Sequence, residues 1–486
     1  MAGVNALFLP GGAKNINLVC LLLAVCFLLF LPLKKEMWYD ESISVLISNG
    51  FSHETAGELS ATQSVSSETL AKMNTSAMVY KATVIDNGNS FIYNIALHYF
   101  CLVCGKSIGT YLWFSKLWGA ASLLAFFTLC NLLFEGSIFT ALALVLFLTD
   151  KVFWGMGHEI RGYQMGIFFI IMATVYCYKF LYRQEKSLYL LLTGLFCVGA
   201  VLSHYLSVYA ILVLVAYLIF TKKAALFSAK NVGAMLLPVA LVGIYLAVSI
   251  SGFQKMSNMN AHIKEKSLTE GFSIVKALIL SLKFTSANFK IAFTAFKDAT
   301  PVILIAFAII AALYFAALKL ATSQIEKRNL NFLVILGVSG TILLAALSIK
   351  SQHYTALYFR YYSFCVPFST LATAYMLKIF FTNARVNKIM AAGIATVVFI
   401  PCIAIFALSI IKHKPELSYN HIAIAAELVK SNISTIEIPD WRDAMMIQSF
   451  LPANKNVQYL MNTSSQDFVL HTSDGLQKIP VIRLDN

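Results

Sequence analysis

Two adjacent carboxylates, Asp40 and Glu41, directly follow the first apolar stretch of the chain. Acidic side chains at the boundary with an apolar phase are energetically costly, and the ionisation of two neighbours is coupled. Such a pair suits a general base that works near neutral pH. A solvated helix start explains the pair equally well, because acids are favoured at the positive end of the helix dipole. The two residues alone leave both explanations open.

A second group of chemically active side chains lies within 158–163 and consists of His158, Glu159, Arg161 and Tyr163. If the segment is helical, residues 158 and 161 share one face, as do 159 and 163. The group offers a carboxylate, a permanent planar cation and a phenol, which can bind a phosphate or a sugar, or a metal through His158 and Glu159. The alternative is a structural Glu–Arg pair at a helix end, which we favour over metal ligation because a lone His–Glu neighbour pair is a weak metal signal.

Three further positions carry polar side chains next to apolar runs. His204 and Tyr205 form a turn between two apolar stretches, Arg360 precedes Tyr361 at the start of another, and Asp86 opens a turn rich in Asn and Gly. A cation beside lipid is a functional hypothesis by default. The same residues have explanations that need no function: Arg360 can snorkel to the interface, His204 can be a packed histidine, and Asp86 can open a plain β-turn.

The composition identifies an integral membrane protein. Of 486 residues, 59% are hydrophobic and only 12% are charged, and the mean hydropathy is +0.74. These values exclude soluble globular, disordered and disulfide-scaffold classes. The net charge of +14 is scattered without a basic run, so it indicates loop topology and anionic partners, not nucleic acid. The nine cysteines lie mostly in apolar stretches, which argues against a disulfide framework.

Eleven apolar runs of roughly 17 to 25 residues are long enough to cross a bilayer as helices. A shorter twelfth run, 91–105, carries Asn94 and His98 and fits a helix lying flat at the interface equally well. The eleven runs are 16–33, 112–134, 138–154, 162–182, 188–203, 205–220, 232–250, 301–319, 332–349, 362–381 and 389–411.

The orientation follows from the compact loops rich in Lys and Arg, which remain in the cytoplasm. These loops fall on one side only if every run from residue 112 onward spans and 91–105 does not. The N-terminus is then cytoplasmic, and 91–105 is a juxtamembrane helix. The four loops follow residues 182, 220, 319 and 381.

The expected fold is an α-helical polytopic membrane protein with about eleven transmembrane helices and a small C-terminal α/β domain. We assign 1–411 to the transmembrane part, with a first outer loop at 34–111 that holds juxtamembrane helices and another outer loop at 251–300. Residues 412–486 form the outer α/β domain. Within the 251–300 loop, 272–282 is too short to span and predicts an interfacial helix. The tail pattern predicts helices at 419–431 and 441–450 and strands at 435–438, 457–461, 468–471 and 479–484.

This topology places the chemically active side chains on the outer face, each at a helix end. Acids and cations beside a lipid phase indicate a reaction between a hydroxyl acceptor and a lipid-linked phosphate. A base removes the acceptor proton and a cation stabilises the departing phosphate. The residues that converge are Asp40, Glu41, Asp86, Glu159, Arg161, His204 and Arg360.

The order of the motifs resembles the GT-C superfamily of membrane glycosyltransferases. The branch is that of the protein O-mannosyltransferases, the aminoarabinose transferase of lipid A and the rhizobial lipopolysaccharide-core transferases. The likeness covers most of 1–410. The chain departs from the family where a double proline is replaced by Asn89 and Ser90, and where an arginine is replaced by Lys116 or its neighbours. The motifs that match are Trp-Tyr-Asp40-Glu41-Ser, Glu159-Ile-Arg161-Gly-Tyr163, and Arg360-Tyr361 ahead of Pro367.

The resemblance implies an inverting transfer of one monosaccharide from a polyprenyl-phosphate donor to a cell-envelope glycan, lipid or protein hydroxyl. It implies Asp40 as the general base with Glu41 supporting it, and the 251–300 loop as the cover of the lipid groove. It also implies a multi-pass protein of the bacterial inner membrane with a periplasmic active site. The residues expected at the donor phosphate or sugar are Asp86, Glu159, Arg161, Tyr163, His204, Tyr205, Arg360 and Tyr361.

Metal dependence is left open by the resemblance, because some members of the superfamily use a divalent cation, such as Mg²⁺ or Mn²⁺, and others do not. His158 and Glu159 are the weak candidate ligands. A lipid or solute transporter is the competing function, and it predicts charges at the middle of the membrane, which most of the expected spans lack. A scaffold protein that uses its tail for binding is a third possibility, and it has no need of the outer cluster.

Overall fold

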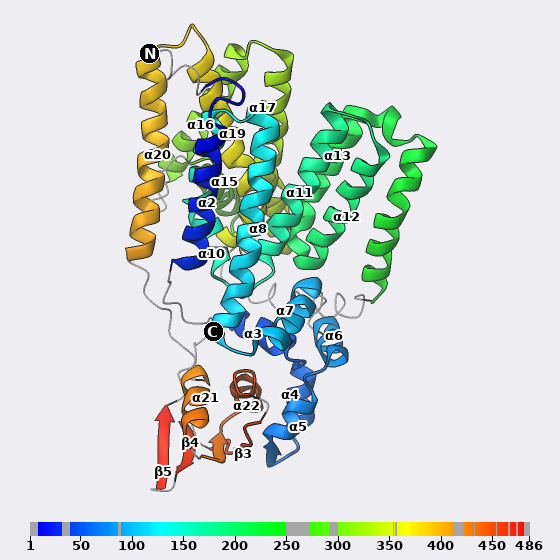
Figure 1. The fold of residues 1–486 in the computed structure, drawn as a ribbon, viewed down its shortest axis with the longest axis vertical. Coiled ribbons are helices and arrows are strands. Elements are labelled where there is room, and N and C mark those ends of the chain that lie inside the picture. The colour runs from blue at the N-terminus through cyan, green and yellow to red at the C-terminus, as the bar shows by residue number, and fades with distance from the viewer. Residues whose placement is uncertain are drawn as a thin grey trace.

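Long helices form one bundle, and shorter helices and a small sheet lie at one end of it (Figure 1). We call this end region, residues 39–104 with 421–480, the head. The computed structural model describes residues 8–31, 39–85, 89–248, 272–290, 300–352, 354, 357–411, 421–431, 433–452, 454–464, 467–472 and 475–480.

All eleven apolar runs contain helix. Among the described residues, seven helices are long and apolar enough to cross a membrane, or eight if one bent pair is counted as a span. Three further runs appear as apolar helices of 17 residues each, namely α2, α12 and α19. A polytopic helical membrane protein is therefore confirmed, and the count of eleven spans stays a prediction. The bundle consists of α2 (Lys14–Phe30), α8 (Ile108–Phe134), α9 (Ile138–Leu148), α10 (Lys151–Gly157), α11 (Tyr163–Tyr182), α12 (Ser187–Ser203), η1 (Tyr205–Ser207), α13 (Val208–Leu226), the helix Ala229–Val248, α15 (Ile274–Asn288), α16 (Thr300–Leu320), α17 (Gln324–Gly337), α18 (Ser339–Ser351), η4 (Phe359–Phe364), α19 (Val366–Thr382) and α20 (Lys388–Ile411).

The run predicted as one span at 138–154 is broken. Helices α9 and α10 meet at an angle of 65°. Asp150 stands at the break, where its Oδ1 accepts hydrogen bonds from the main-chain N–H groups of Val152 at 2.8 Å and Phe153 at 3.0 Å. A carboxylate can therefore start α10 inside the bundle, because it satisfies two donors that the break leaves unpaired.

Helix α15 contains most of the segment predicted to be interfacial, 272–282, and it packs against α16 and α18. Its polar side is inward: Ser281 donates to the main-chain oxygen of Thr341 at 2.8 Å. Ile274, Val275 and Leu278 on its other side are exposed. The exposed side also carries Lys276, and a mixture of apolar and charged residues is typical of an interfacial helix.

Lys290, directly after the end of α15, is buried and forms an ion pair with Asp150. The pair links the broken span to the segment from the 251–300 loop. The broken span is therefore an exception to the expectation that the interiors of most spans lack charged residues.

The head joins the first outer loop and the tail in one five-stranded sheet of order β1-β3-β2-β4-β5. Strands β2 and β3 are parallel, and the other neighbours are antiparallel. Two helices and three strands of the tail lie where the sequence predicts them. The strand predicted at 479–484 overlaps β5 only at residues 479–480, and 481–484 lies outside the described residues. The head contains α3 (Tyr39–Ser48), α4 (His53–Leu59), β1 (Ser64–Ser66), α5 (Ser67–Lys72), α6 (Ser76–Ile85), α7 (Phe91–Cys104), α21 (His421–Lys430), β2 (Thr435–Ile438), α22 (Trp441–Gln448), β3 (Gln458–Met461), β4 (Asp467–Thr472) and β5 (Gly475–Pro480).

Strand β1 comes from the first outer loop, a pairing that the sequence did not indicate. The two parts also share an apolar core that includes Phe51 and Leu70 of the loop and Trp441 and Tyr459 of the tail. Tyr111 at the start of α8 donates to the main-chain oxygen of residue 449 at 3.0 Å, which ties the tail to the bundle. The tail and the first loop therefore fold as one body, and the head is fixed over the helix ends.

Candidate active site

Asp40 and Glu41 occupy the first turn of α3, where acids are favoured by the helix dipole. Their environments differ. The Asp40 side chain is 25% exposed, whereas Glu41 is 1% exposed and its Oε1 accepts a hydrogen bond from the main-chain N–H of Ile160 at 2.7 Å. Asp40 is thus accessible to a reactant, and Glu41 fastens α3 to the turn between α10 and α11.

Arg161 lies on that turn, and it also reaches α3. Its Nη1 donates to the main-chain oxygen of Asp40 at 3.0 Å and to Ser44 Oγ at 3.4 Å. Residues 158–162 form a turn and not a helix, so the helical face-sharing considered for them does not apply. These two hydrogen bonds hold the guanidinium group of Arg161 beside the carboxylates.

Arg360, on η4, approaches the carboxylate of Asp40. Its Nη2 lies 3.3 Å from Asp40 Oδ2, and its side chain is 17% exposed. The guanidinium lies over the rings of Tyr358 and Tyr361, with centroid distances of 5.2 and 5.3 Å. Glu159 is close enough to interact with it electrostatically. Two permanent cations and three carboxylates therefore meet where the head joins the bundle.

An aromatic layer lies beneath these charges. Tyr163 stacks on His204 with centroids 4.4 Å apart, and His204 is 5.3 Å from Tyr205 and 6.3 Å from Tyr361. Burial holds the pKa of His204 well below its usual range, and the positive charges of Arg161 and Arg360 lower it further. His204 is consequently a neutral imidazole at physiological pH.

Gly162 allows the turn to approach the end of α12. A Cβ on Gly162 would lie 2.1 Å from the main-chain oxygen of Ser203 and 3.1 Å from Ser90 Oγ. Any larger residue at this position must displace a main-chain carbonyl. The close contact brings the N-terminus of α7, the turn that carries Arg161, and His204 together at one point.

The structure brings together most of the residues predicted for the site but not all of them. Asp86 lies outside the described residues. His158 donates from Nδ1 to the main-chain oxygen of Trp154 at 2.9 Å and packs against that indole at 4.6 Å, so it serves the end of α10. Within the described ranges, no group of three or more His, Cys, Asp or Glu side chains is placed to hold a metal ion. A divalent cation stays a prediction, and His158 and Glu159 do not form a ligand set by themselves.

Sequence reasoning missed several residues that shape the site. Ser44 follows Asp40 by one helical turn, a spacing that a helical reading of 39–48 reveals. The Asp150–Lys290 pair could have been suspected from the sequence, because Asp150 is a charged residue inside an apolar run. No sequence pattern indicates the close approach at Gly162. Lys116, compared above with a family arginine, donates to the main-chain oxygens of residues 29 and 31 at 3.1 and 3.4 Å, and so closes the end of α2.

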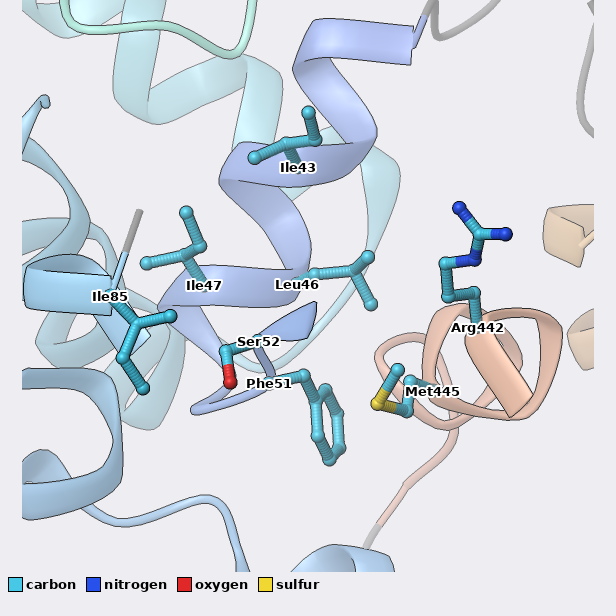
Figure 2. Close-up of a pocket in the computed structure, with 8 residues that line it drawn as sticks. All are labelled: Ile43, Leu46, Ile47, Phe51, Ser52, Ile85, Arg442 and Met445. Atoms are coloured by element: carbon cyan, nitrogen blue, oxygen red, sulfur yellow. The ribbon is translucent and has the colours of Figure 1, made fainter. Parts of the chain in front are cut away.

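A small apolar pocket lies between α3 and the tail helix α22. Figure 2 shows Leu46 and Phe51 directed toward Arg442 and Met445 of α22. The pocket begins on the same helix as Asp40, one turn farther from the bundle. It is lined by Ile43, Leu46, Ile47, Phe51, Ser52, Ile85, Arg442 and Met445.

No family model matches the sequence, and no curated protein matches it. The chain is similar to the crystal structure of the Archaeoglobus fulgidus oligosaccharyltransferase in complex with Zn and sulfate, with a TM-score of 0.43 and 12% identity over 90% of this chain. This chain spans 57% of the length of that protein. It is also similar to ArnT from Cupriavidus metallidurans bound to undecaprenyl phosphate, with a TM-score of 0.37 and 12% identity over 90% of this chain and 84% of that one.

Proposed function

We propose that this chain is a membrane glycosyltransferase that moves a monosaccharide from a polyprenyl-phosphate donor to a hydroxyl group of a cell-envelope acceptor. The proposed location is the periplasmic face of a bacterial inner membrane. The observation that carries the proposal is the meeting of an accessible Asp40 with Arg161 and Arg360 at one end of an apolar bundle. Transfer from a lipid-linked phosphate needs a base for the acceptor and cations for the phosphate at the membrane surface.

The proposed step is a single displacement at the anomeric carbon. The acceptor oxygen attacks C1 from the side opposite the phosphate, and its proton passes to Asp40. The bond between C1 and the phosphate oxygen breaks as the new C1–O bond forms, so the configuration inverts. Polyprenyl phosphate leaves with the bonding electrons. A nearby carboxylate also stabilises the positive charge that develops on the sugar ring in the transition state.

The remaining residues receive roles from their contacts. Arg360 touches Asp40 in this structure, and its guanidinium has further N–H donors that can take a phosphate oxygen at the same time. Arg161 is aimed at the same place by its bond to the main-chain oxygen of Asp40. Glu41 is a positioning residue, because its carboxylate is occupied by the N–H of Ile160.

The test is sugar transfer by the purified full-length protein in nanodiscs. Radiolabelled polyprenyl-phosphate monosaccharides are supplied singly, with a membrane extract as acceptor. The proposal expects that one donor loses its sugar to the acceptor and that the product has the opposite anomeric configuration. Retention of configuration, or no turnover of any donor, would contradict it.

A polytopic transporter is the second candidate, and the Asp150–Lys290 pair favours it. Buried charges near the middle of a bundle mark solute or ion pathways in many transporters. In this chain the two charges neutralise each other and the carboxylate also starts a helix. Flux of a labelled lipid or solute in vesicles, without any glycosyl transfer, would support this candidate.

A further inference from the structure

Ser90 stands directly before α7, and it does not behave as a helix-capping serine. Its backbone is left-handed, with φ 56° and ψ 34°, and its side chain makes no capping hydrogen bond. A serine at this position normally accepts a bond from an N–H of the first turn. A left-handed conformation costs a residue with a Cβ about 1–2 kcal/mol. Ser90 is 2% exposed. Its hydroxyl group has no hydrogen-bond partner among the described residues.

Three other buried atoms near Ser90 share this property. Asn94, one turn along α7, is 1% exposed. Its Nδ2 donates to the main-chain oxygen of Asn89 at 3.4 Å, while its Oδ1 has no described partner. The Tyr163 hydroxyl and His204 Nε2 are equally buried and unpaired within the described part of the chain. Buried polar atoms in native proteins are nearly always paired, with protein groups, water or a ligand, so a cluster of four unpaired atoms marks a place where a polar ligand can bind.

The four atoms belong to elements that meet at the Gly162 turn. Ser90 Oγ lies 3.1 Å from the point where a Cβ on Gly162 would stand. Gly162 separates Arg161 from Tyr163, and Tyr163 stacks on His204. The cluster is thus adjacent to the arginine that contacts Asp40.

We propose that Ser90, Asn94, Tyr163 and His204 form a subsite for the hydroxyl groups of the transferred sugar, which is a neutral, polyhydroxylated monosaccharide. The inference rests on the proposed function and names the substrate class of that site. Hydroxyl, amide, phenol and neutral imidazole groups can each pair with a sugar hydroxyl, which both donates and accepts. The arginines hold the phosphate and the neutral cluster reads the sugar, so the two parts of the donor are recognised by different residues.

This division can be measured by binding two lipids to the full-length protein in nanodiscs. The probes are undecaprenyl phosphate alone and undecaprenyl phosphate that carries glucose or mannose. The variants are Ser90→Gly, which permits the left-handed backbone and removes the hydroxymethyl side chain, and Asn94→Leu. Ser107→Ala is the matched control, because Ser107 caps the next helix in the ordinary way by accepting from Thr110 N at 3.0 Å.

The expected result is that each site variant weakens binding of one hexose-bearing lipid about tenfold and leaves undecaprenyl phosphate within about twofold of wild type. The control variant should bind both lipids as wild type does. Unchanged binding of the hexose-bearing lipids in both site variants would overturn the subsite. Tighter binding of a lipid with a free amino sugar than of either hexose would also overturn it.

Failure of the subsite is distinguishable from failure of the proposed function. Binding of both lipids by wild type, with the variants weakening both equally, would refute only the division of roles. Binding of neither lipid by wild type would refute the proposed function and the subsite with it.

Discussion

The Asp150–Lys290 pair should be the most sensitive point of the bundle to loss of a single charge. Helix α9 begins at the end of the bundle near Gly136, and its 11 residues rise about 16 Å at ~1.5 Å per residue. The pair therefore lies about halfway across a hydrocarbon core of ~30 Å. The side chains are 3% exposed for Lys290 and 7% for Asp150. Neither charge has water available if its partner is removed.

The perturbation is a double-mutant cycle with Asp150→Asn and Lys290→Met. Asparagine retains an oxygen that can accept the bonds from Val152 and Phe153, so the helix start survives and only the charge is lost. Each single variant leaves an unpaired buried charge and should lose about 3–5 kcal/mol of stability. The double variant buries no charge and should lose much less, so the coupling energy should be about 3 kcal/mol or more.

The assay is the free energy of unfolding in mixed detergent micelles for wild type and the three variants. The matched control is the same cycle at Glu68 and Lys72, an exposed pair whose atoms are 2.9 Å apart. Exposed pairs contribute little, so its coupling should be close to the experimental error. Single variants at 150 and 290 that cost less than about 1 kcal/mol, or a double variant whose cost equals the sum of the two, would refute the reasoning.

Two further predictions concern the turn and the sheet. Gly162→Ala should destabilise the protein by about 1–3 kcal/mol or more, because the new methyl group meets a main-chain carbonyl at 2.1 Å. The control is Gly155→Ala, whose methyl group meets nothing within 4 Å. In a thermal melt this control should be neutral or stabilising. In the head, hydrogen bonds from Asn462 and then His471 lower the pKa of Glu437 from its ordinary 4.5. A depressed carboxyl pKa stabilises the folded state above the ordinary value and loses that effect as pH falls through the folded value. The difference in melting temperature between wild type and Glu437→Gln should therefore be constant near pH 7 and shrink below pH 4.5, and a difference that is the same at pH 7 and pH 3.5 would contradict this account.

Helix positions were predictable because length and hydropathy alone determine which runs can cross a membrane. The tail elements were predictable for a related reason: β2 (Thr435–Ile438) matches its predicted range, since a short β-rich run between polar stretches has few other structures open to it. The pairing of β1 with β3 was not predictable, because Ser64–Ser66 is short, polar and almost 400 residues away from its partner in the chain. Such contacts depend on tertiary structure and leave no periodic signal.

The charged part of the site was partly predictable. The loop charges predict an orientation that places Asp40, Arg161 and Arg360 on one face. The structure adds which atoms meet: a guanidinium 3.3 Å from Asp40 Oδ2 and another at its main-chain oxygen. The neutral cluster at Ser90 and Asn94 was not predicted, because burial without a partner is a property of packing and cannot be read from residue types.

The central claim is that Asp40 is the base of a glycosyl transfer, and kinetics of an Asp40→Asn variant test it most directly. The control is Asp440→Asn, which alters another aspartate paired with an arginine, at 2.9 Å, in an exposed part of the head. Transfer from the accepted polyprenyl-phosphate donor should fall by about 10²–10⁴-fold in Asp40→Asn, with donor binding and thermal stability retained, and should be unchanged in Asp440→Asn. Equal transfer by wild type and Asp40→Asn would contradict the account and remove Asp40 as the base.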